Sequence, residues 1–219
     1  MEELYTTWKA IGVAGGDLSF FQDFFVKFYQ AFIEGDRWLQ YLNGVKTTLL
    51  VTALALILGL FKFNELPQGG SISFEMLPLF IFITRWGPGW GLIGCFAFGI
   101  LQAFVQGAVS YGWVSILLDY VVAFGVIGFG GFFRGKIFAA SVVGAVCRFI
   151  IHFISGITVY KILVPTSLFG LTFVNPWIYS LVYNGWYNVI DLVLCLVIFA
   201  LLMRSPVKKY LRAEDLRSA

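Results

Sequence analysis

Long apolar segments are the feature that most constrains the fold of this chain. Turn signals divide the sequence into six of them, at residues 45–62, 75–85, 87–108, 114–133, 137–160 and 176–204. A helix needs about 20 apolar residues to cross a hydrocarbon core of ~30 Å. Composition agrees, because only 12% of the 219 residues are charged, whereas soluble domains contain about 25%. The sequence therefore predicts an all-α integral membrane protein with six transmembrane helices, the second of them short and tilted.

The basic residues predict how these helices are oriented. Most of them fall on the side of the two termini: Arg85, Arg134, Lys136, Arg204, Lys208, Lys209, Arg212 and Arg217. Only Lys62 and Lys161 fall on the other side. By the positive-inside rule both termini are expected in the cytoplasm, with the loops 63–74, 109–113 and 161–175 facing outward.

The chain is expected to have three parts: an amphipathic segment at residues 1–43, a six-helix membrane domain at 44–206, and a basic cytoplasmic tail at 207–219. Apolar side chains recur at helical spacing in the first part, at Leu18, Phe21, Phe24, Phe25, Phe28 and Phe32. Such a stripe is typical of a helix that lies in the membrane interface. Docking to a partner protein is the alternative for this segment.

The fifth apolar segment carries a polar face. Arg148, His152, Gly156 and Tyr160 recur every four residues, so a helix places them on one side. A charged side chain at the bilayer centre costs about 2.5–3.5 kcal/mol on the insertion scale. Helix depth, counted at ~1.5 Å per residue, puts Asp191 level with Arg148. We therefore predict a structural ion pair between these two residues.

Other polar and aromatic residues fall at one depth in the outer half of the last three segments. Carboxylate, imidazole and amide groups supply hydrogen bonds, and the tyrosines supply faces for cation–π contact. The sequence thus predicts an outward-opening pocket for a flat, cationic, hydrogen-bonding ligand. The predicted ligand-binding residues are Asp119, Tyr120, His152, Gly156, Tyr160, Tyr179, Asn184 and Asn188.

The first apolar segment carries a face of small residues, Thr48, Thr52, Ala55 and Gly59. Small side chains let helices approach closely in lipid. This pattern predicts either packing inside the chain or docking to a separate membrane subunit, and we assigned the four residues to partner docking.

Motifs for catalysis, metal binding and nucleotide hydrolysis are absent from the sequence. It contains no GxxxxGK[ST] loop, no HExxH and no GxSxG. The three cysteines show no metal-ligand spacing; they are Cys95, Cys147 and Cys195. The sequence also has no run of basic residues interleaved with aromatic residues, the pattern that would suggest nucleic-acid binding. We expect a protein that is not an enzyme, holds no cofactor or metal, and takes energy for transport from another chain.

Four stretches carry a resemblance to a known family: SISFEMLPLFIFITRWGPGWGLIGCFAFGILQ (71–102), LLDYVVAFGVIGFGG (117–131), CRFIIHFISG (147–156) and NPWIYSLVYNG (175–185). The chain resembles the thiamine-specific substrate-binding (S) components of energy-coupling factor transporters. This resemblance implies a six-helix S-component in the bacterial cytoplasmic membrane that captures thiamine from outside. Its implied partners are a transmembrane coupling subunit and two ABC-type ATPases.

The resemblance also assigns roles to individual residues. The binding glutamate of the family falls on Asp119, its histidine on His152 and its helix-6 asparagine on Asn184, while Tyr160 stands where a stacking tryptophan is expected. Three alternatives remain open. They are an S-component for a thiamine precursor or another cationic heteroaromatic nutrient, an intramembrane enzyme using Asp119 and His152 as acid and base, and a stand-alone channel.

Overall fold

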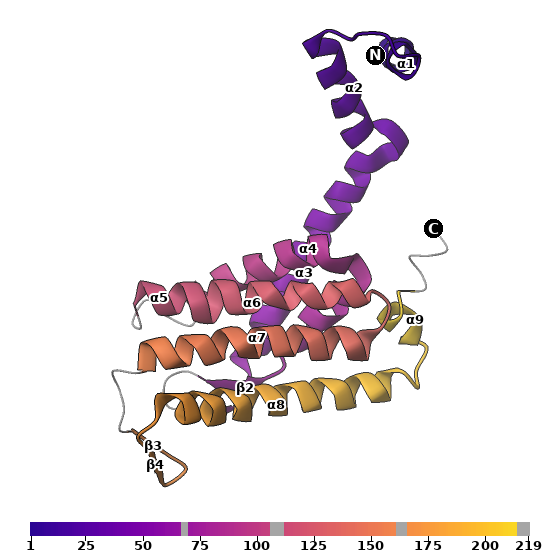
Figure 1. Cartoon of the computed structure of the whole chain (residues 1–219). Helices are drawn as coiled ribbons and strands as arrows, with labels where there is room; N and C mark the ends of the chain where they lie inside the picture. The colour runs from indigo at the N-terminus through magenta and orange to yellow at the C-terminus, as the bar shows by residue number, and fades with distance from the viewer. Residues whose placement is uncertain (67–69, 106–111, 161–165, 214–219) are drawn as a thin grey trace. The chain divides into compact units, whose positions relative to one another are not determined.

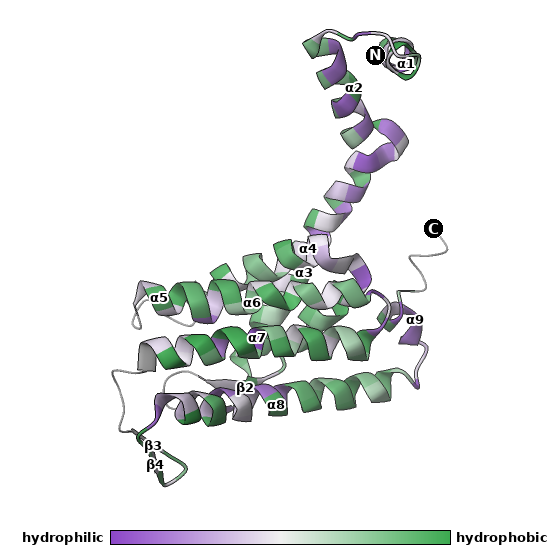
Figure 2. Ribbon diagram, viewed as in Figure 1, coloured by the Kyte–Doolittle hydropathy of each residue, from purple (hydrophilic) through white to green (hydrophobic). Residues whose placement is uncertain are grey.

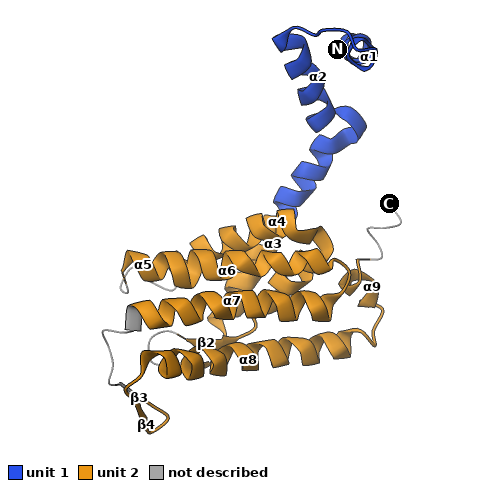
Figure 3. Ribbon diagram, in the orientation of Figure 1, with its two compact units in different colours: residues 1–47 blue, residues 48–219 orange. Residues whose placement is uncertain are grey.

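The structure is a computed structural model, and it describes residues 1–66, 70–105, 112–160 and 166–213 (Figure 1). The side chains of residues 159, 160 and 166 lie outside this description. The chain divides into two compact units, Met1–Thr47 and Thr48–Ala219 (Figure 3). The boundary between them falls inside helix α3 (Arg37–Leu60).

The first unit is a helical hairpin, where the sequence had suggested one amphipathic helix. It contains α1 (Glu2–Val13), α2 (Phe20–Phe32), the 3₁₀ turn η1 (Glu34–Asp36) and the beginning of α3. Gly15, at φ 78°, lies between the two helices, in a backbone region that glycine adopts without steric cost. Ser19 then starts α2 with a reciprocal capping box to Gln22.

The second unit contains the rest of the long apolar helices. They are α4 (Met76–Val105), the composite span α5 (Trp113–Ser115), η3 (Ile116–Val122), α6 (Ala123–Gly125) and η4 (Val126–Phe133), then α7 (Ile137–Tyr160) and α8 (Pro176–Leu202). Figure 2 shows α7 and α8 as mainly hydrophobic ribbons interrupted by hydrophilic turns. Together with Glu34–Leu60, five described helices are long and apolar enough to cross a membrane. The protein is therefore a multi-pass membrane protein.

The difference between six predicted helices and five observed ones lies within α4. This element includes the second and third predicted segments, and its backbone breaks between them at Gly87, with φ 76° and ψ −172°. Pro88 follows directly, and proline cannot donate the helical hydrogen bond. The Arg134 side chain donates from Nε to the Arg85 carbonyl at 2.9 Å beside this break. The predicted turn is present, and the helix resumes after it.

Glycines bring the third span into backbone contact with α4. A Cβ on Gly128 would lie 2.5 Å from the Leu92 nitrogen, and one on Gly131 would lie 2.5 Å from the Gly87 carbonyl carbon. Real Cβ atoms do not approach that closely, so these positions require glycine. Close approach through small residues is a general way of packing helices in lipid.

Short β-hairpins occupy two of the predicted loops. β1 (Lys62–Glu65) pairs antiparallel with β2 (Ser71–Ser73), and β3 (Thr166–Leu168) pairs antiparallel with β4 (Leu171–Phe173). These strands were not predicted, because strands of three or four residues leave too short an alternation to recognise in a sequence.

The beginning of the predicted basic tail packs against the membrane unit. Helix α9 (Lys208–Leu211) buries Leu211 in the main hydrophobic core. Arg85 Nη1 donates to the Tyr210 carbonyl at 3.0 Å. Residues 207–213 therefore belong to the folded domain, and residues 214–219 lie outside the described part.

Candidate ligand-binding site

Arg148, on α7, contacts two buried carboxylates. Its Nη2 lies 3.3 Å from Glu75 Oε1, and its Nη1 lies 3.7 Å from Asp191 Oδ2. The guanidinium also lies over the Phe124 ring, 4.4 Å from the centroid. The predicted partner Asp191 is thus present, but the closer carboxylate is Glu75. Only the Glu75 contact is a hydrogen bond, and the Asp191 contact is an ion pair at a longer distance.

Glu75 is the site residue that sequence reasoning missed. It is only 3% exposed, and Gln102 Nε2 donates to its Oε2 at 2.8 Å. The backbone N–H of Ser73, two residues earlier, donates to Asp191 Oδ1 at 3.1 Å. Strand β2 therefore enters the helix bundle and buries the carboxylate that follows it. The available signal was a single acidic residue within an otherwise apolar stretch.

Asp119 and His152 form the second polar contact of the site. Asp119 Oδ1 lies 3.3 Å from His152 Nδ1, and Ser115 Oγ donates to Asp119 Oδ2 at 2.6 Å. Asp119 belongs to η3, a π-helical segment, and such segments often occur at functional sites because they re-aim side chains. His152 is buried, and no described residue hydrogen-bonds its Nε2. The imidazole therefore keeps one polar atom unused.

The two asparagines of α8 hydrogen-bond within the protein. Asn184 Nδ2 donates to the His152 carbonyl and to Ser180 Oγ, both at 3.1 Å, while Tyr187 OH donates to Asn184 Oδ1 at 2.9 Å. Asn188 Nδ2 donates to the Asn184 carbonyl at 2.8 Å. Asn184 thus ties α8 to the backbone of α7 at the histidine. The structure brings Asp119, His152 and Asn184 into one connected group.

The predicted aromatic residues are distributed differently. Tyr179 is buried and stacks on Tyr183, which the sequence analysis had not selected, with ring centroids 5.6 Å apart. Tyr187, also not selected, lies edge-on to the His152 ring at 6.0 Å. Tyr120 is partly buried against the hydrophobic core. The side chain of Tyr160 lies outside the described residues. Spacing of four along α8 could have identified the column of Tyr179, Tyr183 and Tyr187.

Gly156 lets α7 and α8 approach at this level. A Cβ there would lie 2.9 Å from Asn184 Nδ2 and closer still to Ser180 Oγ. We expect Gly156→Ala to destabilise the protein by about 1–3 kcal/mol, as overpacking does, and to weaken ligand binding by displacing Asn184. Thermal unfolding and a ligand titration measure both effects.

Gly185→Ala is the matched control, because its Cβ would meet only Phe149 at 3.8 Å, an ordinary contact. Helix propensity favours that alanine by about 0.8–1 kcal/mol, so stability should stay equal or rise. Equal behaviour of the two variants would contradict the close-approach role of Gly156.

The four residues predicted to dock a partner, Thr48, Thr52, Ala55 and Gly59, are buried within the chain itself. The first three are buried within the protein, Ala55 completely. A Cβ on Gly59 would lie 2.9 Å from Glu75 Oε2. This face packs against the chain's own core, so it is not exposed to another subunit in this structure. Small residues serve internal and external helix contacts alike, so the pattern alone could not separate them.

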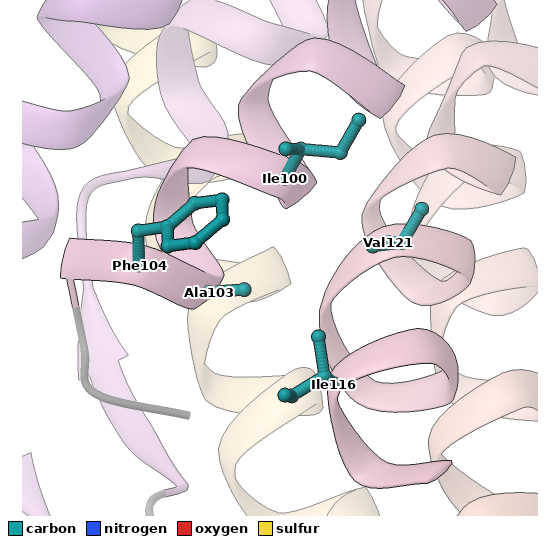
Figure 4. A pocket seen from close by; sticks show the side chains of 5 residues that line it. All are labelled: Ile100, Ala103, Phe104, Ile116 and Val121. Atoms are coloured by element: carbon teal, nitrogen blue, oxygen red, sulfur yellow. The ribbon is translucent and has the colours of Figure 1, made fainter. Parts of the chain in front are cut away.

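A cavity of about 180 Å³ lies between α4 and η3. Figure 4 shows its lining, which consists of Ile100, Ala103, Phe104, Ile116 and Val121. All five side chains are apolar, so the cavity offers no hydrogen bond or charge to a polar cation. The candidate site is therefore the polar group around Asp119 and Arg148 and not this cavity.

Comparison with known proteins decides the family. Residues 45–211 match the family model described as "Thiamine transporter protein". The chain belongs to this family. A relative from Bacillus subtilis, the thiamine transporter ThiT, is 33% identical over 72% of this chain and 88% of its own length. ThiT of Lacticaseibacillus paracasei is 24% identical over 71% of this chain and 84% of its own length.

A solved structure confirms the fold. ThiT from Listeria monocytogenes superposes with a TM-score of 0.66 at 19% identity, covering 78% of this chain and 98% of that one. The chain thus has the S-component fold predicted from its sequence. Members of this thiamine transporter family are transporters and not enzymes, which sets aside an acid–base role for Asp119 and His152.

Proposed function

We propose that this thiamine transporter family member binds thiamine itself, in the polar group formed by α7, α8, η3 and Glu75. Thiamine combines a permanently cationic thiazolium, an aminopyrimidine and a hydroxyethyl arm. The observation that carries the proposal is the Asp119–His152 contact, which leaves His152 Nε2 buried without a partner among the described residues. Thiamine is chosen as the ligand because the relatives from Bacillus subtilis and Lacticaseibacillus paracasei are both named thiamine transporters.

Charge in the site favours a cation. Three buried or largely buried carboxylates, Glu75, Asp119 and Asp191, lie around one guanidinium, Arg148, and one imidazole, His152. A carboxylate away from water needs a nearby positive charge or several hydrogen bonds. A thiazolium ring would supply a further positive charge, and this charge does not depend on a proton that could be lost.

Hydrogen bonding favours the aminopyrimidine. An ionised carboxylate only accepts hydrogen bonds, so in the neutral His152 ring Nδ1 donates to Asp119 and Nε2 is an acceptor. The amino group of the pyrimidine can donate to either Asp119 or His152 Nε2. Tyr120, Tyr160 and Tyr179 are proposed to contact the ligand rings. Asn184 and Asn188 hydrogen-bond the backbone of the site, and Gly156 leaves room for Asn184.

We further propose that the protein works as the S-component of an energy-coupling factor importer in a bacterial cytoplasmic membrane. A transmembrane coupling subunit and two ABC-type ATPases would energise it, since the sequence carries no nucleotide-binding loop. The site would open outward, with both termini in the cytoplasm. The burial of the small-residue face of α3 favours another surface of this chain as the contact for the coupling subunit.

Titration of the purified protein with thiamine tests the binding proposal. Seven tryptophans are present, so intrinsic fluorescence should change saturably, and calorimetry should give one site. Titrations with the aminopyrimidine half and the thiazole half of thiamine test the ligand class, and both should bind more weakly than thiamine. Tighter binding of one half would identify a precursor as the ligand, and no saturable binding would remove the thiamine proposal.

A further inference from the structure

Helix α2, in the first unit, has an aromatic face that remains largely exposed. This unit lies almost entirely outside the family match, which begins at residue 45. The face consists of five exposed phenylalanines: Phe20, Phe21, Phe24, Phe28 and Phe32. Phe20 and Phe21 are 80% and 79% exposed. We refer to these five residues as the phenylalanine face.

The other sides of α2 already have partners. Tyr29 stacks on Tyr5 of α1 at 4.2 Å, and Phe25 meets Trp8 of α1 edge-on at 5.3 Å. Asp23 and Lys27 pair at 2.7 Å. At about 100° per residue, the phenylalanine face occupies an arc of about 120° between these two sectors. Packing against α1 therefore fixes which face of α2 is left open.

The open face is too apolar for water. An aromatic side chain buries about 150–250 Å² when covered, and monomeric soluble proteins rarely expose apolar patches larger than a few hundred Å². Something must cover five clustered phenylalanines. The candidates are the bilayer, a second protein and another copy of this chain.

Continuity with the first membrane span favours the bilayer. Phe28 and Phe32 rings lie 5.0 Å apart, and Phe32 contacts Tyr41 of α3 at 5.5 Å. Helix α3 continues into the apolar segment that crosses the membrane. Only η1 (Glu34–Asp36) and Ile33 separate α2 from α3. The short connection holds α2 at high effective concentration beside the membrane surface.

Charge argues against attraction by anionic lipid. Residues 1–47 contain six carboxylate side chains and four basic ones. Two of the basic residues, Lys9 and Lys27, are paired with Glu34 and Asp23. We propose that α2 lies in the bilayer interface with its phenylalanine face buried at the headgroup–acyl boundary. Burial of the phenylalanine face alone holds α2 in the interface, so α2 should also bind membranes made only of zwitterionic lipid.

The test uses the full-length protein, one copy per phosphatidylcholine nanodisc, with Cys95, Cys147 and Cys195 replaced by alanine. A nitroxide is attached at Phe24→Cys, on the phenylalanine face, or at Gln30→Cys, on the opposite side of α2. Accessibility to oxygen, which concentrates in lipid, is compared with accessibility to a water-soluble nickel chelate. Unchanged elution and thermal unfolding show that each variant folds.

The expected result is that Phe24→Cys favours oxygen several-fold more than Gln30→Cys. This difference should persist at about 1 M salt, where the Debye length is about 3 Å, and should disappear when Phe20 and Phe28 are replaced by serine. A nickel-accessible probe at both positions would overturn the proposal, because the phenylalanine face would then lie in water. Dependence on anionic lipid or on low salt would overturn the purely apolar attachment.

Discussion

Asp119→Asn is expected to weaken thiamine binding by about 2–5 kcal/mol, the usual effect of truncating one side of a buried charged contact. That corresponds to at least about a 30-fold rise in Kd. Asparagine keeps an oxygen to accept from Ser115, whose Oγ lies 2.6 Å from the carboxylate. It loses the negative charge that would balance the thiazolium. Calorimetric titration in detergent measures the change.

Asp23→Asn is the matched control for this variant. Asp23 pairs with Lys27 on the exposed side of α2, in the first unit, so the same chemical change should leave thiamine affinity unaltered. Thermal unfolding without ligand should be similar for both variants. An Asp119→Asn protein that is folded and binds thiamine as tightly as the unmodified chain would place the anionic contact elsewhere, with Glu75 as the next carboxylate to test.

Arg148→Met is expected to cause a large loss of stability. The change leaves Glu75 and Asp191 buried without the guanidinium that contacts both. Removing one partner of a buried ion pair typically costs about 3–5 kcal/mol. In a chain of this size such a loss lowers Tm by on the order of 10 °C. Thermal unfolding of the ligand-free protein measures it.

Two further variants show whether charge is the cause. Arg148→Lys keeps the charge but cannot contact both carboxylates through a planar fork. Its Tm should therefore fall between the Tm of the unmodified protein and that of Arg148→Met. Arg148→Met combined with Glu75→Gln and Asp191→Asn removes all three charges and should recover part of the lost stability. If the triple variant is less stable than Arg148→Met alone, the carboxylates are held by other contacts and the arginine serves packing.

Local patterns predicted several parts of the protein directly. Apolar runs identified α7 and α8 within two residues of their observed ends, because a helix that crosses lipid must satisfy its own backbone and be apolar throughout. The Gly87–Pro88 pair marked the break in α4, since glycine allows positive φ and proline removes a donor. Helical spacing also placed Arg148 and His152 on one side of α7.

Other parts depended on which helix faces meet in space. Glu75 and Arg148 are 73 residues apart in the sequence, and no local pattern shows that β2 enters the bundle at that point. The π-helical backbone around Asp119 has no recognisable sequence signal either. The sequence also does not show which way the small-residue face of α3 points. Small residues can pack equally well against the same chain or against a separate subunit.

By itself, the sequence determined the membrane class, the position of the spans, and the polar residues that lipid cannot accommodate. Those properties follow from single helices in a solvent without hydrogen bonds. Only the tertiary structure decided that Arg148 is shared between Glu75 and Asp191, that Asn184 holds the His152 backbone, and that His152 Nε2 stays unused. Such assignments depend on distances between helices, which sequence spacing within one helix does not contain.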